Sequence, residues 1–204
     1  MNPKEIDRFF KGVAKDFGEE VDIILTGAAA GSLMGNLRPS MDIDFAVKIK
    51  KKRRESWKDF SRAVEKNKNL TGVSADYSED IDRWGSITLL DYPKHARPYK
   101  KMGSLTLRVL EPAYWSIGKM TRYIEPDIED MKAVFKKQGV KAPALARLWG
   151  KALRASPLSE TLSLFRKQVE HFLEKVGPKI WSKGFDASKA IREFHKSAGI
   201  REGD

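Results

Sequence analysis

The apolar pattern of this chain changes near residue 110, and this change is what most restricts the folds it can adopt. Before it, short apolar runs of strand length alternate with stripes at helical spacing. After it, only helical stripes follow, most of them opened by a proline. We therefore expect an α/β (α+β) core over residues 1–110, with a small mixed sheet flanked by helices. A helical C-terminal region over residues 111–204 is expected to pack on that core.

Turn residues and periodicity place the individual elements. In the first part, helices are expected over 2–17, 28–34 and 55–67, and strands over 21–25, 43–49, 73–77, 84–90 and 104–109. A turn is expected at 67–72 and a basic, proline-punctuated loop at 91–98. In the second part, helices are expected from 112 and over 127–138, 143–154, 156–176 and 187–197. A boundary near residue 140 is the alternative to one near 110.

Composition restricts the class of protein. The chain has 204 residues, of which 41% are hydrophobic and 33% charged, and this balance is typical of a globular protein. Cysteine is absent, which excludes disulfides and thiolate zinc sites and makes the cytoplasm the expected compartment. We expect no membrane partner, because the sequence contains neither a long apolar run nor a signal-peptide pattern. The net charge of +11 favours a polyanion: nucleic acid, a nucleotide or an acidic protein partner.

Two aspartates flank Ile43 at the start of the expected strand 43–49. Residues two apart on a strand point to the same face, so Asp42 and Asp44 should lie together. Carboxylates a few ångströms apart repel each other unless a cation lies between them. Hard divalent cations bind such oxygens and also bind substrate phosphates. The pair therefore predicts a Mg²⁺ (or Mn²⁺) site, although an Asp-x-Asp triplet also occurs on solvated strand edges.

The chain just before the aspartates has features of a phosphate site. A strand ends at Thr26–Gly27 and a helix of small residues follows. A glycine there lets the N–H groups of the helix start approach a phosphate, and Ala28 keeps that approach open. Arg38 can grip phosphate oxygens or pair with an aspartate, and Ser40 can fix the turn before the second strand.

The segment LTGAAAGSLMGNLRPSMDIDFAV resembles the signature of the polymerase-β-like nucleotidyltransferase superfamily. The AbiEii/MenT toxin-type group is the variety it resembles most, and the matching positions are Gly27, Ala30, Arg38, Ser40, Asp42, Ile43 and Asp44. The resemblance covers roughly residues 20–135 and implies a nucleoside triphosphate as substrate. One position departs from the pattern, because Ala28 replaces the usual second glycine or serine. A register that uses Gly31–Ser32 restores that pair, but Gly27 is preferred because the strand ends there.

The resemblance also implies a third acid on a neighbouring strand, which completes the metal site and can act as general base. Asp76 is the candidate, because it lies on the expected strand 73–77. Asp80 and Asp82 form another Asp-x-Asp, but their surroundings are typical of a turn or a helix start, where capping is the expected role.

A looser match follows in LEPAYWSIGKMTRYIEPDIEDM, where Lys119, Arg122, Asp127 and Asp130 have the order found in relatives. The resemblance implies that Lys119 contacts the triphosphate and that Asp127 orients Lys119 or acts near the acceptor. The alternative is that they are ordinary surface charges, since an acid in the first turn of a helix is favoured by the helix dipole.

These features lead to two main hypotheses. The first is a Mg²⁺-dependent enzyme that moves a nucleoside monophosphate to a hydroxyl on RNA, with a tRNA end as first candidate, or on protein. It would be the toxin of a toxin–antitoxin pair. The second is an inactive module on the same fold that binds nucleic acid or a protein, to which the basic run Lys48–Arg54 and the basic segment around His95 could contribute. An aminoglycoside-modifying enzyme is disfavoured, because cationic drugs need an acidic cleft. No feature indicates an oligomeric state.

Overall fold

The computed structural model describes residues 2–35, 42–51, 53–79, 81, 83–181 and 184–201. It consists of two compact units, one formed by Met1–Ile81 with Pro93–Glu111 and the other by Asp82–Tyr92 with Pro112–Asp204. The first unit holds a five-stranded mixed sheet flanked by helices, and the C-terminal part of the chain is helical, so the expected fold class is confirmed. The observed division differs from the expected one in that residues 82–92 belong with the second unit.

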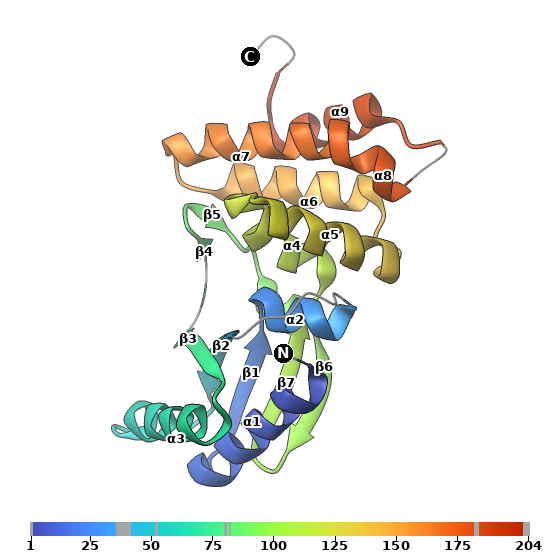
Figure 1. The fold of residues 1–204 in the computed structure, drawn as a ribbon. Helices are drawn as coiled ribbons and strands as arrows, with labels where there is room; N and C mark the ends of the chain where they lie inside the picture. The colour runs from blue at the N-terminus through green and yellow to red at the C-terminus, as the bar shows by residue number, and fades with distance from the viewer. Residues whose placement is uncertain are drawn as a thin grey trace. The chain divides into compact units, whose positions relative to one another are not determined.

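The sheet of the first unit has the order β3-β2-β1-β7-β6 (Figure 1). The strands are β1 (Val21–Leu25), β2 (Asp42–Ile49), β3 (Ser74–Glu79), β6 (Ala96–Met102) and β7 (Leu105–Leu110). The central strand β1 is antiparallel to β2 and parallel to β7. On the outside, β3 is parallel to β2 and β6 is antiparallel to β7.

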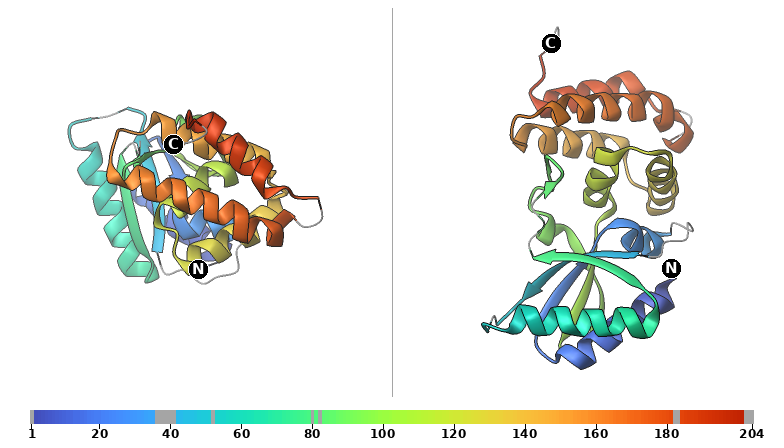
Figure 2. Two further views of the ribbon diagram at one scale, coloured as in Figure 1. Left: turned by 90° about the horizontal axis from the view of Figure 1, so that it is seen from above. Right: turned by 60° about the vertical axis from the view of Figure 1, so that its left-hand side comes forward.

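Helices α1 (Pro3–Phe17) and α3 (Ser56–Thr71) pack against each other in this unit, as Figure 2 shows. Helix α1 begins as the sequence predicts: the Asn2 side chain accepts from the N–H of Glu5, while the Glu5 carboxylate accepts from the N–H of Asn2. It ends at Gly18, which has a left-handed φ of 73°. The apolar stripe from Ile6 to Phe17 is buried, so the amphipathic pattern correctly identified the inner face of the helix.

One face of the sheet carries the core and the other carries the carboxylates. Alternation along β2 places Ile43, Phe45 and Val47 on one side, and all three are buried. The Phe45 ring meets Phe10 of α1 edge-on, with 5.2 Å between the ring centroids. Asp42 and Asp44 alternate with these residues and therefore point away from the face on which α1 packs.

The prediction for residues 84–102 was wrong in two respects. The expected strand 84–90 is instead a small hairpin of β4 (Arg83–Trp84) and β5 (Ile87–Thr88), in a sheet of its own. The expected loop 91–98 is a 3₁₀ turn, Tyr92–His95, followed by the edge strand β6. Most residues of β6 are exposed, so the strand has no alternating apolar pattern to reveal it. Pro98 sits at an irregularity in its register, which is where an edge strand tolerates proline.

Helix α3 is longer than predicted and runs through the expected turn at 67–72 as far as Thr71. The reason is the buried Asn67, whose side chain donates to the Ala63 carbonyl and to Asp16 instead of turning the chain. Trp57 of this helix is 36% exposed and lies over Phe60 and Tyr77.

The described residues of the second unit form six α-helices and the β4–β5 hairpin. The helices are α4 (Pro112–Arg122), α5 (Glu125–Gln138), α6 (Ala142–Ala155), α7 (Glu160–His171), α8 (Gly177–Trp181) and α9 (Ala187–Ala198). Trp149 of α6 is fully buried against Phe135 and Phe172, and its indole N–H donates to Ser116 Oγ at 3.0 Å. The hairpin is tied to this unit by the Thr88 N–H, which donates to Ser156 Oγ at 2.9 Å.

The expected single helix over 156–176 was also wrong. Helix α7 begins only at Glu160, and after His171 the chain makes a π-helical turn, Phe172–Val176, that leads directly into α8. Gly177 and Pro178 therefore do not end the helix. Pro178 is the second residue of α8 and follows directly on this turn, in which the Gly177 N–H donates to the Phe172 carbonyl. None of the described helices combines the length and the apolarity that a bilayer crossing requires.

Gly150 is where α6 and α9 come closest. A Cβ at residue 150 would lie 2.6 Å from the Phe194 carbonyl oxygen and 2.6 Å from Ser197 Cβ. We expect Gly150→Ala to destabilise the second unit by about 1–3 kcal/mol, because overpacking against backbone outweighs the gain of about 1 kcal/mol in helix propensity. Urea denaturation measures the change, and a stabilised variant would show that α9 moves aside without cost.

Candidate metal centre

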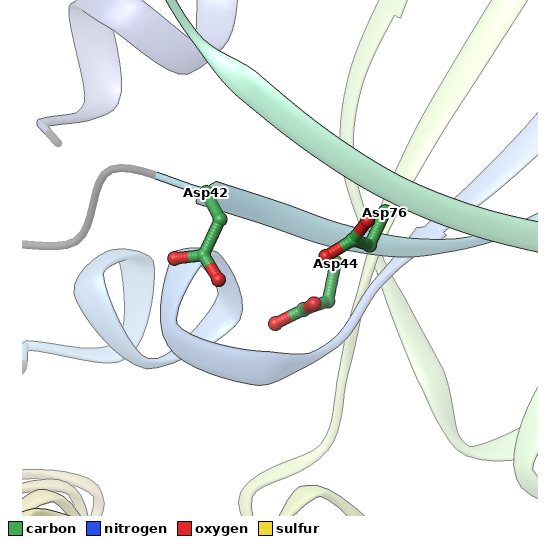
Figure 3. Close-up of side chains that lie close together, drawn as sticks. All are labelled: Asp42, Asp44 and Asp76. Carbon is green, nitrogen blue, oxygen red and sulfur yellow. The ribbon is translucent and has the colours of Figure 1, made fainter.

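Three carboxylates from two strands meet at one end of the sheet in the first unit. Asp42 and Asp44 project from β2 and Asp76 from β3, as Figure 3 shows. One ligand atom from each can be chosen so that all three lie within 4.8 Å of one another. The structure therefore brings together the three aspartates that the sequence singled out as metal ligands.

The register between β2 and β3 is what unites them. Asp44 is the partner of Asp76 in this parallel pair, and in-register residues of neighbouring strands share a face. On the opposite face the next pair, Phe45 and Tyr77, stacks with ring centroids 5.3 Å apart and an interplanar angle of 8°. Because a slip of one residue would turn Asp76 to the other face and break this stack, the aromatic pair holds the acid in place.

The start of α2 (Gly27–Met34) lies beside this cluster. Gly27 has a φ of 51°, and a Cβ built on it would overlap the Asp44 carboxylate, so only glycine fits. The Thr26 N–H donates to the Asp44 carbonyl at 2.9 Å, which joins the end of β1 to β2 at this point. Helix α2 begins at Gly27, whereas Gly31 and Ser32 lie inside it; this is the register preferred from the sequence.

The cluster fits a hard divalent cation. Its donors are all carboxylate oxygens, which such cations prefer, and a cation between them removes their mutual repulsion. Asp44 is half-buried and Asp76 is exposed, so one side of the cluster remains open to further ligands.

A second observation beside the carboxylates points to a polar ligand. Thr26 is 3% exposed, and its Oγ1 is buried without a hydrogen-bond partner among the described residues. An unsatisfied buried hydroxyl costs about 1–3 kcal/mol, which a ligand oxygen would recover. The sequence marked Thr26 only as the end of a strand. Its position as the residue before the first turn of a helix was the signal that could have identified it.

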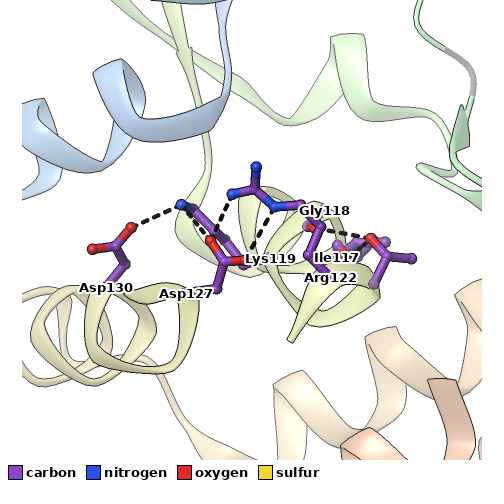
Figure 4. A network of polar contacts seen from close by, with 7 residues as sticks. Ile117, Gly118, Lys119, Arg122, Asp127 and Asp130 are labelled. Atoms are coloured by element: carbon purple, nitrogen blue, oxygen red, sulfur yellow. Dashed lines mark hydrogen bonds and ion pairs between the residues drawn. The ribbon is translucent and has the colours of Figure 1, made fainter. Parts of the chain in front are cut away.

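Lys119 and Asp127 lie in the second unit and form part of a cluster of four charges (Figure 4). Lys119 Nζ donates to Asp127 Oδ1 at 2.8 Å and to Asp130 Oδ2 at 2.7 Å. Arg122 donates to both oxygens of Asp127, at 2.6 and 3.0 Å. The cluster is neutral overall, with two cations and two anions. Asp127 thus forms an ion pair with Lys119, and Asp130 is a further partner that the sequence did not assign to the site.

Several residues singled out in the sequence lie outside the described residues. They are Arg38, Ser40, Asp80 and Asp82. Ala28 is described and occupies the first turn of α2, directly after Gly27. Comparisons with protein-family models, with curated proteins and with solved structures gave no match.

The first prediction from this site concerns Asp76. Without metal, Asp76→Asn should raise the free energy of unfolding slightly, by up to about 1 kcal/mol, because it removes one of three mutually repelling charges. With Mn²⁺ at about 100 times the Kd, the free energy of unfolding of the wild type should rise by about 2.7 kcal/mol and that of the variant by much less. Thermal denaturation with and without Mn²⁺ measures both effects. Asp59→Asn, which removes an exposed carboxylate of α3, is the control. If Mn²⁺ stabilises the Asp76 variant as much as the wild type, Asp76 is not a metal ligand.

The second prediction concerns the cluster around Lys119. The side chains of Asp127 and Asp130 are 0% and 1% exposed, so Lys119→Met would leave two buried carboxylates with one cation fewer. We expect a loss of about 3–5 kcal/mol in the free energy of unfolding. Lys175→Met, which removes an exposed lysine beside Glu174, should cost less than about 1 kcal/mol. Similar losses in the two variants, measured in urea, would contradict the structural role.

Proposed function

We propose that the protein is a Mg²⁺-dependent (or Mn²⁺-dependent) nucleotidyltransferase that moves a nucleoside monophosphate from a nucleoside triphosphate to a hydroxyl on RNA or protein. The observation that carries the proposal is the meeting of Asp42, Asp44 and Asp76 beside the glycine that opens α2. Carboxylates and a backbone approach for phosphate are the two requirements of metal-assisted phosphoryl transfer.

The triphosphate site is proposed at the start of α2. The first N–H groups of a helix have no helical partner, and they favour an anion. Gly27 leaves the backbone accessible, and the buried Thr26 hydroxyl offers a donor to the same ligand. Ala28 contributes only its backbone N–H, so binding there depends more on the helix start than it would with a serine.

The proposed reaction is a displacement at the α-phosphorus. The acceptor hydroxyl oxygen forms a bond to the α-phosphorus, the bond to the bridging oxygen of the β-phosphate breaks, and pyrophosphate leaves. Asp76, which is exposed, accepts the hydroxyl proton as general base. Asp42 and Asp44 hold the divalent cation, which when bound neutralises phosphate charge.

The wider role is proposed from the resemblance of residues 20–135 to the AbiEii/MenT toxin-type group. On that basis we propose activity as the toxin of a toxin–antitoxin pair, with tRNA as the first acceptor to test. The lack of cysteine accords with the cytoplasm as the proposed compartment.

Transfer of label tests the proposal directly. Protein, Mg²⁺ and each nucleoside triphosphate labelled at the α-phosphate are incubated with total RNA or with a protein extract. Wild type should label one class of acceptor. Asp42→Asn and Asp44→Asn should each lower the rate by roughly 10²–10⁴-fold, because metal-assisted charge stabilisation contributes several kcal/mol.

Asp59→Asn is again the matched control and should transfer at the original rate. Label at the γ-phosphate should not appear on the acceptor, since pyrophosphate leaves with it. Transfer that is equal in the Asp42 and control variants would exclude this site as the catalytic centre.

The alternative is a catalytically inactive module that binds nucleic acid or a partner protein. Ala28 is the observation that favours it, because the side chain adds no donor at a position where relatives carry a glycine or a serine. Metal binding by wild type without transfer to any acceptor would support this alternative.

A further inference from the structure

A basic groove in the first unit is lined by α1 and by the end of β6 with the turn that follows it. Figure 1 shows where α1 and β6 lie in this unit. The volume of the groove is about 940 Å³. The cations that line it are Lys4, Arg8, Lys11, Lys15, Lys100 and Lys101. Asp7 is the one carboxylate among its lining residues.

The cations of α1 form a single row. Lys4, Arg8, Lys11 and Lys15 are separated by four, three and four residues, which places them on one face of the helix. At 1.5 Å per residue the row is roughly 16 Å long, with a charge about every 5 Å along the axis. All four are exposed, and the opposite face of α1 is the buried stripe that packs in the core.

These four side chains make no ion pair with any described residue, and neither does Lys101. Helix α3 in the same unit has the opposite pattern. Its cations Lys58, Arg62 and Lys68 each pair with a carboxylate three residues earlier. Three of the cations on α3 thus have a carboxylate partner within or next to their own helix, whereas the four cations on α1 have none among the described residues.

The arrangement on α1 is unfavourable in isolation. Like charges three or four residues apart destabilise a helix by about 0.2–0.5 kcal/mol per pair, and a lysine in the first turn opposes the helix dipole. Asp7 does not relieve this repulsion, because it is engaged by Lys100. Its hydrogen bond raises the pKa of Lys100, which therefore stays a cation on the far wall of the groove.

We propose that this groove binds the phosphodiester backbone of RNA. A row of unpaired cations with a second cationic wall matches a chain of regularly spaced phosphates, whose binding releases counterions and relieves the repulsion along α1. Recognition through phosphates also requires no particular base sequence.

The position of the groove defines which part of the RNA it holds. Helix α1 packs on the face of the sheet that carries Phe45, whereas Asp42 and Asp44 point from the opposite face. The groove therefore anchors the body of a large RNA and not its reacting end. That the groove binds RNA does not depend on the proposed function. That the bound RNA is the acceptor of the transferred nucleotide does rest on that function.

Binding without catalysis tests the surface. Fluorescein-labelled tRNA is titrated with protein in EDTA over about 50–200 mM salt. The variant Arg8→Gln/Lys11→Gln/Lys15→Gln should bind roughly 100-fold more weakly at about 0.1 M salt. Its slope of log affinity against log salt should fall by roughly 2, since each phosphate contact contributes about 0.7–0.9.

The matched control is Lys58→Gln/Arg62→Gln/Lys68→Gln, which removes the same number of charges from α3. It should change affinity by less than about threefold if contacts and not net charge decide binding. Circular dichroism confirms folding, and the α1 variant should be at least as stable as wild type because like-charge repulsion is removed. Equal losses in the two variants would overturn the proposal.

A second basic groove in the other unit provides a further control. Lys151, Arg154 and Lys196 line it, and their triple glutamine variant should retain tRNA binding. If that variant loses binding while the α1 variant keeps it, the assignment to α1 is wrong. If polyglutamate at the same total negative charge displaces the RNA, the proposal of an RNA ligand is wrong and an acidic protein is the partner. Equal binding of a DNA of the same sequence would support recognition through the backbone.

The acceptor role is tested separately by kinetics. If RNA is the acceptor, the α1 variant should raise KM for RNA by a factor similar to its loss of affinity and leave kcat unchanged, because the groove is remote from the reacting atoms. An equal fall in kcat would contradict the anchoring role. Absence of transfer in wild type would count against the proposed function, whereas the binding result in EDTA would stand.

Discussion

The close approach of Asp44 to Gly27 is the constraint on which the arrangement of β1, α2 and β2 around the three aspartates depends. The Asp44 carboxylate fills the space that any side chain at residue 27 would need. The chain can therefore leave β1, turn through a positive φ and begin α2 directly beside β2. The hydrogen bond from the Thr26 N–H to the Asp44 carbonyl secures the same junction from the backbone. One small residue thus brings a helix start and a carboxylate together, which is why phosphate and metal chemistry can be proposed at one place.

Two charged clusters among the described residues differ in their composition and burial. In the second unit, Asp127 and Asp130 are buried, and the chain provides Lys119 and Arg122 to balance them. Such a cluster gives rigidity, because removal of Lys119 would leave two buried carboxylates with Arg122 as the one remaining cation of the cluster. In the first unit, three carboxylates converge and one of them, Asp76, is exposed. A group of like charges at an accessible position is suited to a cation from solution, and its cost in stability is expected at a functional site.

Most of the first unit could be predicted from the sequence because its elements bury one face. The apolar residues of α1, β1 and β2 are the buried ones, so these elements could be identified from the sequence. Because side chains alternate along a strand, Asp42 and Asp44 could then be placed on a common face of β2. Strand β6 escaped prediction because it is an exposed edge and carries no such pattern. The end of α3 was missed because Asn67, normally a turn residue, is buried and bonded to α1. The convergence of Asp76 with the pair depended on the register of β3, which is held by Tyr77 on Phe45 and is not visible in either segment alone.

The path of the chain between the units has a consequence for biosynthesis. The chain leaves the first unit after Ile81, returns at Pro93 and leaves again after Glu111, so neither unit is a continuous segment. On the ribosome, β1 and β2 emerge early, but β1 lacks its parallel neighbour β7 until residue 110 has been made. The β4–β5 hairpin emerges before β7, yet its partner Ser156 appears far later. The hydrogen bond between Thr88 and Ser156 can therefore form only after α4, α5 and α6 have been made. The carboxylate site can consequently form on a nascent chain before the helical unit is complete.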